Sequence, residues 1–394
     1  MNDHQSSNGS GGSDSGSRAE SVSQPVAGSQ PVAGSQPVAG SQPAGGSQPA
    51  GESRAGDGAG GGGGGAGRGG DAGERRRRGG GDRAMVPPAN FRSYYGRPIV
   101  RAAPWEKDIP SYLFTGGLAA GSALLALGGQ LSRRTALRRA GRLSALAAVG
   151  VSTYFLVNDL GRPERFVNML RVAKPTSAMS MGTWILSGFG VAAGAAAVAE
   201  AAPLLPRRGL LGLVRKVLPP VGAAAGLGAA ALAPGLATYT AVLLADTSTP
   251  SWNAARNELP FVFAGSAMAS GAAVGMIAAP ADQAGPARRM AVLGAGLELY
   301  HAHRVENGMG LLSEPFHQDQ AGKWLRAART LTAAGALGAL AGRRSRLISA
   351  LSGVALLAGS ALTRFGVYEA GIASAKDPKY TVVPQRERLN DKLR

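Results

Sequence analysis

Four ionisable side chains lie within or at the ends of long apolar stretches, where they could transfer protons. Asp159 and Asp246 each end such a stretch, while Glu298 lies inside another and is followed by His301. A spacing of three residues places Glu298 and His301 on one side of a helix, so the pair could relay protons. The alternatives are structural: the aspartates could anchor loops at a membrane surface, and the Glu298–His301 pair could bridge two helices.

Aromatic and basic side chains near these acids could hold a small molecule. Tyr239 precedes Asp246 by seven residues, which is two helical turns, so both side chains face one direction. Tyr112 stands near the start of the first apolar stretch, and Arg364 lies in the last with Tyr368 four residues later. These tyrosines could equally belong to an interfacial aromatic belt, and Arg364 could form a structural salt bridge.

The stretches that position these side chains differ in composition from the rest of the chain. The chain has 394 residues, and its mean hydropathy of -0.00 averages two opposite parts. Residues 1–84 hold almost no large apolar side chain, whereas residues 110–370 are mostly Ala, Leu, Gly and Val with their charges in short clusters. A bilayer requires this separation, because a charge at its centre costs about 2.5–3.5 kcal/mol.

Eight apolar stretches are each near the length of a helix that crosses about 30 Å of hydrocarbon. Strands are excluded, because an open sheet edge leaves backbone groups unpaired in lipid. Glycines at four-residue spacing, such as Gly117/Gly121 and Gly271/Gly275, predict close helix packing. The prediction is an all-α integral membrane bundle of about eight transmembrane helices, within residues 110–370. The expected spans are 110–130, 140–158, 180–202, 219–245, 260–280, 288–304, 324–341 and 345–369.

The connections between these spans fall into two classes. Those after the first, third, fifth and seventh spans are short and rich in arginine, whereas 159–179, 246–259 and 305–323 mix acids, bases, prolines and aromatics. The positive-inside rule places the basic connections in the cytoplasm, with both termini and the long loops outside. Long mixed loops usually carry function. Their arginines are therefore candidate ligand contacts, or ion-pair partners of the two aspartates: Arg162, Arg165 and Arg256.

Three further parts complete the expected organisation. Residues 1–84 repeat the hexapeptide SQPVAG and have little to bury, so this tail is predicted to be disordered. Residues 85–109 form a juxtamembrane segment with Trp105 at headgroup level, and residues 371–394 form a C-terminal extension. Met85 is an alternative start of translation.

Composition also limits the cofactors and partners. The absence of cysteine excludes disulfides, iron–sulfur clusters and thiolate metal sites in this chain, and we expect no metal site. The net charge of +18 comes largely from residues that flank spans, so nucleic acid is not expected as a partner. A transmembrane b-type haem needs axial ligands such as paired histidines inside helices. Only His301 and His303 lie near a helix end, so no haem is expected.

Three segments resemble a known family of membrane proteins. They are DLGRPERFVNML from Asp159, PTSAMSMGTWILSGF from Pro175 and YTAVLLADTSTPSWNAARNELPFVFAGSA from Tyr239. Together with the eight-span count, they resemble the NrfD/PsrC family, the membrane subunits of polysulfide-reductase-type molybdoenzyme complexes. The resemblance covers residues 90–390 approximately. The segment before the first span, WEKD from Trp105, has no histidine where family members place polar quinone-binding side chains.

The resemblance implies a haem-free anchor in the bacterial plasma membrane that binds a quinone, with menaquinone expected, near one surface. It also implies lipid contacts and two partner subunits, a ferredoxin-like iron–sulfur protein and a molybdopterin catalytic subunit of a formate-dehydrogenase-like or polysulfide-reductase-like enzyme. Alone, the chain would catalyse nothing. On this interpretation the proton-transfer residues are Asp159, Asp246, Glu298 and His301, and the quinone contacts are Tyr112, Arg162, Arg165, Tyr239, Arg256, Arg364 and Tyr368.

Two other functions remain open. A transporter would use Glu298, Arg364 and Asp246 to carry an ion or a substrate, but the sequence shows no matching pair of interrupted spans. A purely structural anchor would hold a dehydrogenase at the membrane and bind no quinone. Binding of a quinone analogue to the purified protein separates both alternatives from a quinone-reactive subunit.

Overall fold

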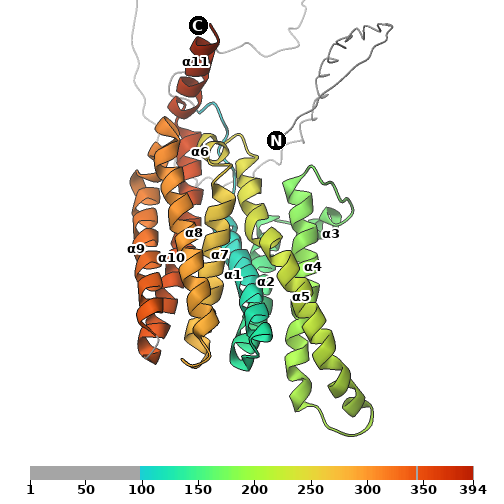
Figure 1. Ribbon diagram of the computed structural model, residues 1–394. Helices are drawn as coiled ribbons and strands as arrows, with labels where there is room; N and C mark the ends of the chain where they lie inside the picture. The colour runs from blue at the N-terminus through green and yellow to red at the C-terminus, as the bar shows by residue number, and fades with distance from the viewer. Residues whose placement is uncertain (1–97, 343–344, 394) are drawn as a thin grey trace, which may run out of the picture. The chain divides into compact units, whose positions relative to one another are not determined.

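Helices form every regular element of the described residues, 98–342 and 345–393, in a computed structural model (Figure 1). These residues belong to one compact unit, Val86–Arg394. The predictions for the tail, residues 1–84, and for residues 85–97 lie outside the described residues. The elements are α1 (Asp108–Leu131), α2 (Thr135–Asp159), α3 (Arg165–Met169), α4 (Ala178–Val198), η1 (Ala199–Leu204), α5 (Gly209–Ala245), α6 (Pro250–Ala254), α7 (Leu259–Ala278), α8 (Gly285–Gly308), η2 (Gly310–Phe316), α9 (Asp319–Ala341), α10 (Arg346–Lys376) and α11 (Lys379–Leu393).

Eight of the helices in the described part are long, and they confirm the predicted all-α membrane fold. Six of them, α1, α2, α4 with η1, α5, α7 and α10, are long and apolar enough to cross a membrane. The other two, α8 and α9, have 24 and 23 residues but more charged side chains. They coincide with the predicted spans 288–304 and 324–341.

The largest differences from the sequence prediction are two helix ends and one additional helix. Helix α5 begins at Gly209 rather than at residue 219, because Pro219 and Pro220 lie inside it and do not end it. Helix α10 continues to Lys376, beyond the predicted end at residue 369. The predicted C-terminal extension contains a further helix, α11, which no apolar periodicity signalled.

Helices that follow one another in the chain pack as hairpins: α1 with α2, α4 with α5, α7 with α8, and α9 with α10. Helix α7 also packs on α1, α5 and α10. The most apolar segment of α1 is 67% buried inside the bundle, and so is that of α7, whereas that of α2 is 33% buried. Helices α1 and α7 therefore form the core of the bundle.

The α1–α7 contact is made by glycine, as the four-residue spacing predicted. A Cβ atom on Gly121 would lie 1.8 Å from the backbone oxygen of Ala267, and one on Gly271 would lie 2.1 Å from the carbonyl carbon of Gly121. Any larger side chain at either glycine would force the two helices apart.

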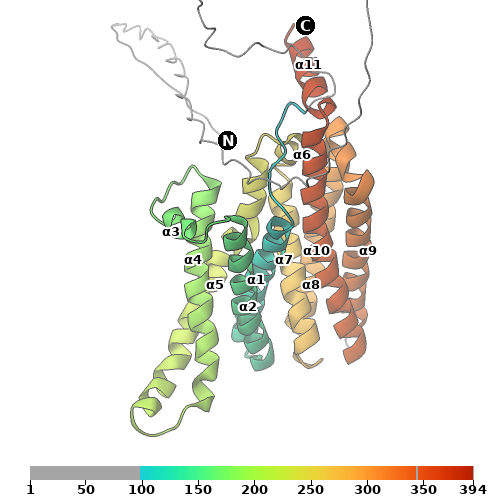
Figure 2. The same cartoon turned by 180° about the vertical axis from the view of Figure 1, so that it is seen from behind.

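The bundle has two different ends, visible in both views (Figures 1 and 2). One end, here called the loop end, carries α3, α6, η2 and α11. The opposite end, the turn end, carries the connections that follow α1, η1 and α7. All the long connections therefore share one end of the bundle, as the alternation of loop types predicted.

Candidate functional site

A cavity of about 180 Å³ lies at the loop end, between α1, α2, α4 and α5. It brings together four residues that the sequence analysis selected separately: Tyr112, Asp159, Arg165 and Tyr239. The rest of its wall is mostly apolar. The lining residues are Trp105, Ile109, Tyr112, Leu113, Leu156, Asp159, Leu160, Arg165, Met169, Met179, Thr183, Tyr239, Leu243 and Leu244.

Two tyrosines form a hydrogen-bonded pair in the wall of this cavity. The hydroxyl groups of Tyr112 from α1 and Tyr239 from α5 bond to each other, and both side chains are buried. Ser152 Oγ on α2 donates to the backbone oxygen of Tyr112 at 3.3 Å. Gly182 on α4 leaves room for the Tyr239 ring, because a Cβ atom there would lie 2.3 Å from Cε2 of that ring. Two neighbouring helices, α2 and α4, thus pack against the helices that carry the two phenols.

The pair can present one proton to a ligand. Two phenols carry two hydroxyl protons, and one of these lies between the two oxygens. The other proton remains free to be donated to a carbonyl oxygen in the cavity. A buried phenol pair of this kind supplies a hydrogen-bond donor without placing a net charge in the membrane.

Asp159 ends α2 and is half-buried in the cavity wall. Within residues 98–342 and 345–393 its carboxylate has no ion-pair partner and no side-chain hydrogen bond. The predicted pairing with Arg162 or Arg165 is therefore not formed. Arg165 lines the cavity from α3 with an exposed side chain, and the exposed Arg162 does not line it.

A cluster of aromatic rings supports the cavity from the side of α6 and α10. Trp105 stacks on Trp252, with 6.1 Å between ring centroids, and Trp252 packs on Tyr368 at 5.9 Å. The Tyr368 hydroxyl donates to the backbone oxygen of Trp105, and Trp252 Nε1 donates to the Val367 oxygen at 2.8 Å. Tyr368 therefore holds Trp105 in position and does not itself line the cavity.

Trp252 was missed by the sequence analysis, although it is fully buried. A Cβ atom on Gly371 would lie 1.9 Å from its ring, so α10 approaches the tryptophan closely. The signal available in the sequence was an aromatic residue within the polar segment TSTPSWNAARNE. Thr183 and Met179, which also line the cavity, had no comparable signal.

Asp246 and Arg256, both predicted site residues, lie away from this cavity. Asp246 follows the last residue of α5 and is exposed, while Tyr239, two turns earlier, faces the cavity. Arg256 is exposed and lines a separate hollow of about 500 Å³ at the loop end, together with Tyr380 and Arg388 of α11.

Glu298 and His301 are not paired with each other in the structure. His301 Nδ1 lies 2.6 Å from Glu258 Oε2, and Arg304 contacts the same carboxylate at 3.0 Å. Glu298 points instead to α10, where it accepts a hydrogen bond of 2.6 Å from Thr363 Oγ1. Each side chain is bonded to a different part of the chain: Glu298 to Thr363 on α10, and His301 to Glu258, which immediately precedes α7.

Glu298 and Arg364 form a buried polar group in the centre of the bundle. Arg364 Nη2 donates to the Phe263 oxygen at 2.8 Å, and its guanidinium lies 3.7 Å from the centroid of the Phe263 ring. No ion pair joins Glu298 to Arg364 among the described residues. Glu298 Oε2 and Arg364 Nε and Nη1 are buried without a protein partner. Such atoms are normally satisfied by ordered water.

Comparison with known protein families gives one match. The sequence model of the family described as NrfD, polysulphide reductase, matches residues 100–300, just over half of the chain. Comparison with curated proteins gives no match. The matched residues include every residue that lines the loop-end cavity, and Glu298 as well.

Proposed function

Because the chain belongs to the NrfD (polysulphide reductase) family of membrane proteins, we propose that it exchanges electrons and protons between a quinone and a partner iron–sulfur subunit of a molybdopterin oxidoreductase. The observation that carries this proposal is the loop-end cavity, where the Tyr112–Tyr239 pair and Asp159 face one apolar space. Four of the residues selected from the sequence, these three and Arg165, therefore line one cavity.

The size and the lining of the cavity fit the ring of a quinone. A space of about 150 Å³ is enough to hold benzene in an apolar protein interior, so 180 Å³ accommodates a small ring system and excludes an isoprenoid tail. The tail would leave past Met179, which lines the cavity and is 52% exposed. An apolar wall with a few polar groups is the usual form of a cofactor site.

The polar groups of the cavity match what quinone chemistry requires of a protein. A quinone, when bound, supplies two-electron, two-proton redox chemistry. The phenol pair donates a hydrogen bond to a ring oxygen and holds the proton nearest to it. Asp159, half-buried and without an ion-pair partner among the described residues, exchanges protons between the cavity and water at the membrane surface.

The proposal also assigns a partner to one end of the bundle and a side of the membrane to the other. The partner iron–sulfur subunit docks at the loop end, which carries α3, α6, η2 and α11 and contains the loop-end cavity. The turn end, with Arg133, Arg134 and Arg139, faces the cytoplasm of a bacterial cell according to the positive-inside rule. Menaquinone is the quinone we expect.

A binding assay with a blocked cavity tests the proposal. Leu156→Trp places an indole in the cavity wall and should abolish binding of a ring-sized quinone analogue to the purified chain. Val151→Trp, on the same helix and 46% exposed outside the cavity, is the matched control and should bind like the wild type. Undiminished binding to the folded Leu156→Trp variant would exclude this cavity as the quinone site.

The buried Glu298–Arg364 group favours proton movement across the membrane as a second candidate function. Its three unpartnered atoms mark a place for ordered water inside the bundle. Arg364 lies against Gly117 of α1, where a Cβ atom would be 3.0 Å from Nη2. Gly117 follows Tyr112 by five residues, or about 7–8 Å along the helix. Proton uptake by reconstituted vesicles during quinone turnover, compared between wild type and Glu298→Gln, tests this function.

A further inference from the structure

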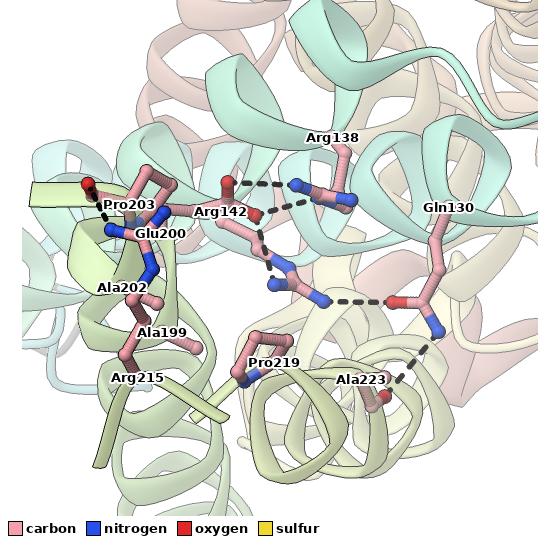
Figure 3. Close-up of a pocket in the computed structure, with 10 residues that line it drawn as sticks. All are labelled: Gln130, Arg138, Arg142, Ala199, Glu200, Ala202, Pro203, Arg215, Pro219 and Ala223. Carbon is pink, nitrogen blue, oxygen red and sulfur yellow. Dashed lines mark hydrogen bonds and ion pairs between the residues drawn. The ribbon is translucent and has the colours of Figure 1, made fainter. Parts of the chain in front are cut away.

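A second cavity, of about 200 Å³, lies at the turn end of the bundle (Figure 3). The ends of α1 and α2, the 3-10 helix η1 and the first half of α5 enclose it. It is lined by three arginines, Arg138, Arg142 and Arg215, and by Glu200. None of the residues discussed for quinone chemistry lies here.

The charges around this cavity do not balance. Glu200 Oε1 accepts from Arg138 at 2.7 Å and from Arg142 at 2.9 Å, and Oε2 accepts from Arg139 at 3.3 Å. Arg215 donates only to backbone oxygens, those of Pro203 and Leu205. Three guanidinium groups therefore share the Glu200 carboxylate, and Arg215 has no carboxylate partner. Among the described residues, these four arginines carry three more positive charges than the one acid that contacts them.

One of these arginines is buried and incompletely bonded. Arg142 is 6% exposed, and its two terminal nitrogens donate to Glu200, the Ala196 oxygen, Gln130 Oε1 and the Gly222 oxygen. Its Nε has no hydrogen-bond partner in the part of the chain that the structure describes. A buried cation with an unused N–H beside a cavity of excess positive charge is costly unless an anion completes it. The planar donors of arginine suit the oxygens of a phosphate group.

The depth of the cavity and its surroundings indicate where the phosphate comes from. Helix α5 has 37 residues, or about 55 Å, whereas the hydrocarbon core is about 30 Å thick. The first turns of α5, including Arg215, therefore reach the headgroup region at the turn end. Further into the membrane than Arg215 on the same helix, Val217 and Val221 are each 48% exposed. Apolar side chains in that position would contact acyl chains.

We propose that this cavity binds a phosphate group, supplied by the headgroup of an anionic phospholipid. The phosphate accepts hydrogen bonds from Arg142 Nε, Arg138 and Arg215, and the acyl chains lie along Val217 and Val221 of α5. Basic pockets between membrane helices are known to hold such headgroups. The proposal is independent of whether the loop-end cavity binds a quinone.

Thermal unfolding of the purified, delipidated full-length chain in a neutral detergent tests this proposal. Short-chain phosphatidylglycerol should raise the midpoint temperature by several degrees, whereas phosphatidylcholine of the same chain length should not. Equal shifts from the two lipids would overturn the proposal. Inorganic phosphate is the third probe: if it matches phosphatidylglycerol at equal concentration, the phosphate site stands and the lipid source is refuted.

Two substitutions locate the effect in the cavity. Arg215→Gln should weaken phosphatidylglycerol binding about tenfold, as expected for the loss of a hydrogen bond to a charged group. Lys216→Gln removes the same charge from the next residue, which is exposed and does not line the cavity, and should leave binding within about twofold. Equal losses in the two variants would reduce the effect to general surface charge and overturn the proposal.

A gain of affinity gives the strictest test. Glu200→Gln removes the one carboxylate that, among the described residues, contacts Arg138 and Arg142 and would compete with a phosphate for them. If these groups bind phosphate, the folded variant should bind phosphatidylglycerol more tightly than the wild type and gain more midpoint temperature from it. If the arginine network serves only to fix η1, the variant should be destabilised and phosphatidylglycerol should not restore it.

Discussion

Removal of the hydroxyl groups of Tyr112 and Tyr239, singly and together, tests whether the two side chains act as one donor. They share a hydrogen bond, so only one of their two hydroxyl protons is available to a ligand. Deleting the phenol that faces the ligand removes that contact, and deleting the other removes the support behind it. The double variant Tyr112→Phe/Tyr239→Phe can lose no more than the ligand-facing contact and its support.

The size of the effect follows from the energetics of a buried hydrogen bond. An unmade bond to a buried polar group costs about 1–3 kcal/mol, and about 1.4 kcal/mol changes a dissociation constant tenfold. The more severe single variant should therefore raise the Kd of a quinone analogue about tenfold. Two independent contacts would multiply to about a hundredfold in the double variant. A hydrogen-bonded pair instead predicts a double variant close to the more severe single one, with a coupling energy of about 1 kcal/mol.

Quenching of tryptophan fluorescence by the analogue measures these constants, since Trp105 lines the same cavity. Tyr154→Phe is the control, because Tyr154 is 65% exposed on α2 and does not line the cavity. Thermal unfolding of each variant shows that the bundle is intact. Additive losses, or an unchanged Kd in all three variants, would refute the shared-donor reasoning.

Three further predictions concern other parts of the molecule. Asp159→Asn should lower quinone-linked turnover and leave membrane assembly intact; failure of the variant to insert would show that Asp159 is structural. Gly121→Ala should destabilise the bundle by about 1–3 kcal/mol in detergent unfolding, because its Cβ would meet the α7 backbone, whereas Gly128→Ala on the same helix has open space and should cost nothing. The Lys379 ammonium lowers the pKa of Glu314 by hydrogen bonding, and Glu314 in turn raises the pKa of Lys379. The ion pair thus stabilises the start of α11 at pH values above the unfolded pKa of Glu314 and below that of Lys379. Protease cleavage after residue 379 should therefore accelerate as the pH falls below about 4.5, because Glu314 becomes protonated. Between pH 6 and 9 the susceptibility of this site to cleavage should not change.

The sequence was sufficient for the parts of the site that lie on one helix or follow it directly. Tyr239 could be placed from its position in an apolar stretch, and Asp159 from its position at the end of one, because helical periodicity and span length decide both. Close packing of α1 on α7 was also predictable, since Gly121 and Gly271 have no side chain to separate the helices. Each of these inferences needs only local information.

The predictions that were wrong or incomplete concern contacts between segments that are distant in the chain. Periodicity placed Glu298 and His301 on one face, but could not show that each of them has a partner distant in the chain, Thr363 on α10 and Glu258 just before α7. The same limit applies to Trp252, which is buried by α10 more than a hundred residues later. The predicted start of α5 was wrong for a different reason. Prolines favour helix starts, yet Pro219 and Pro220 are accommodated inside this helix.

The contact between Gly121 and Gly271 has a consequence for biogenesis. The two glycines are 150 positions apart, and a ribosome that adds 5–20 residues per second needs roughly 8–30 s to make the second after the first. During that interval the face of α1 that will contact α7 has no such partner in the nascent chain. The insertion machinery or lipid must therefore cover the glycine-containing face of α1 until α7 is inserted and packs against it. Alleles that slow translation between these two helices should reduce the yield of the protein without altering the mature molecule.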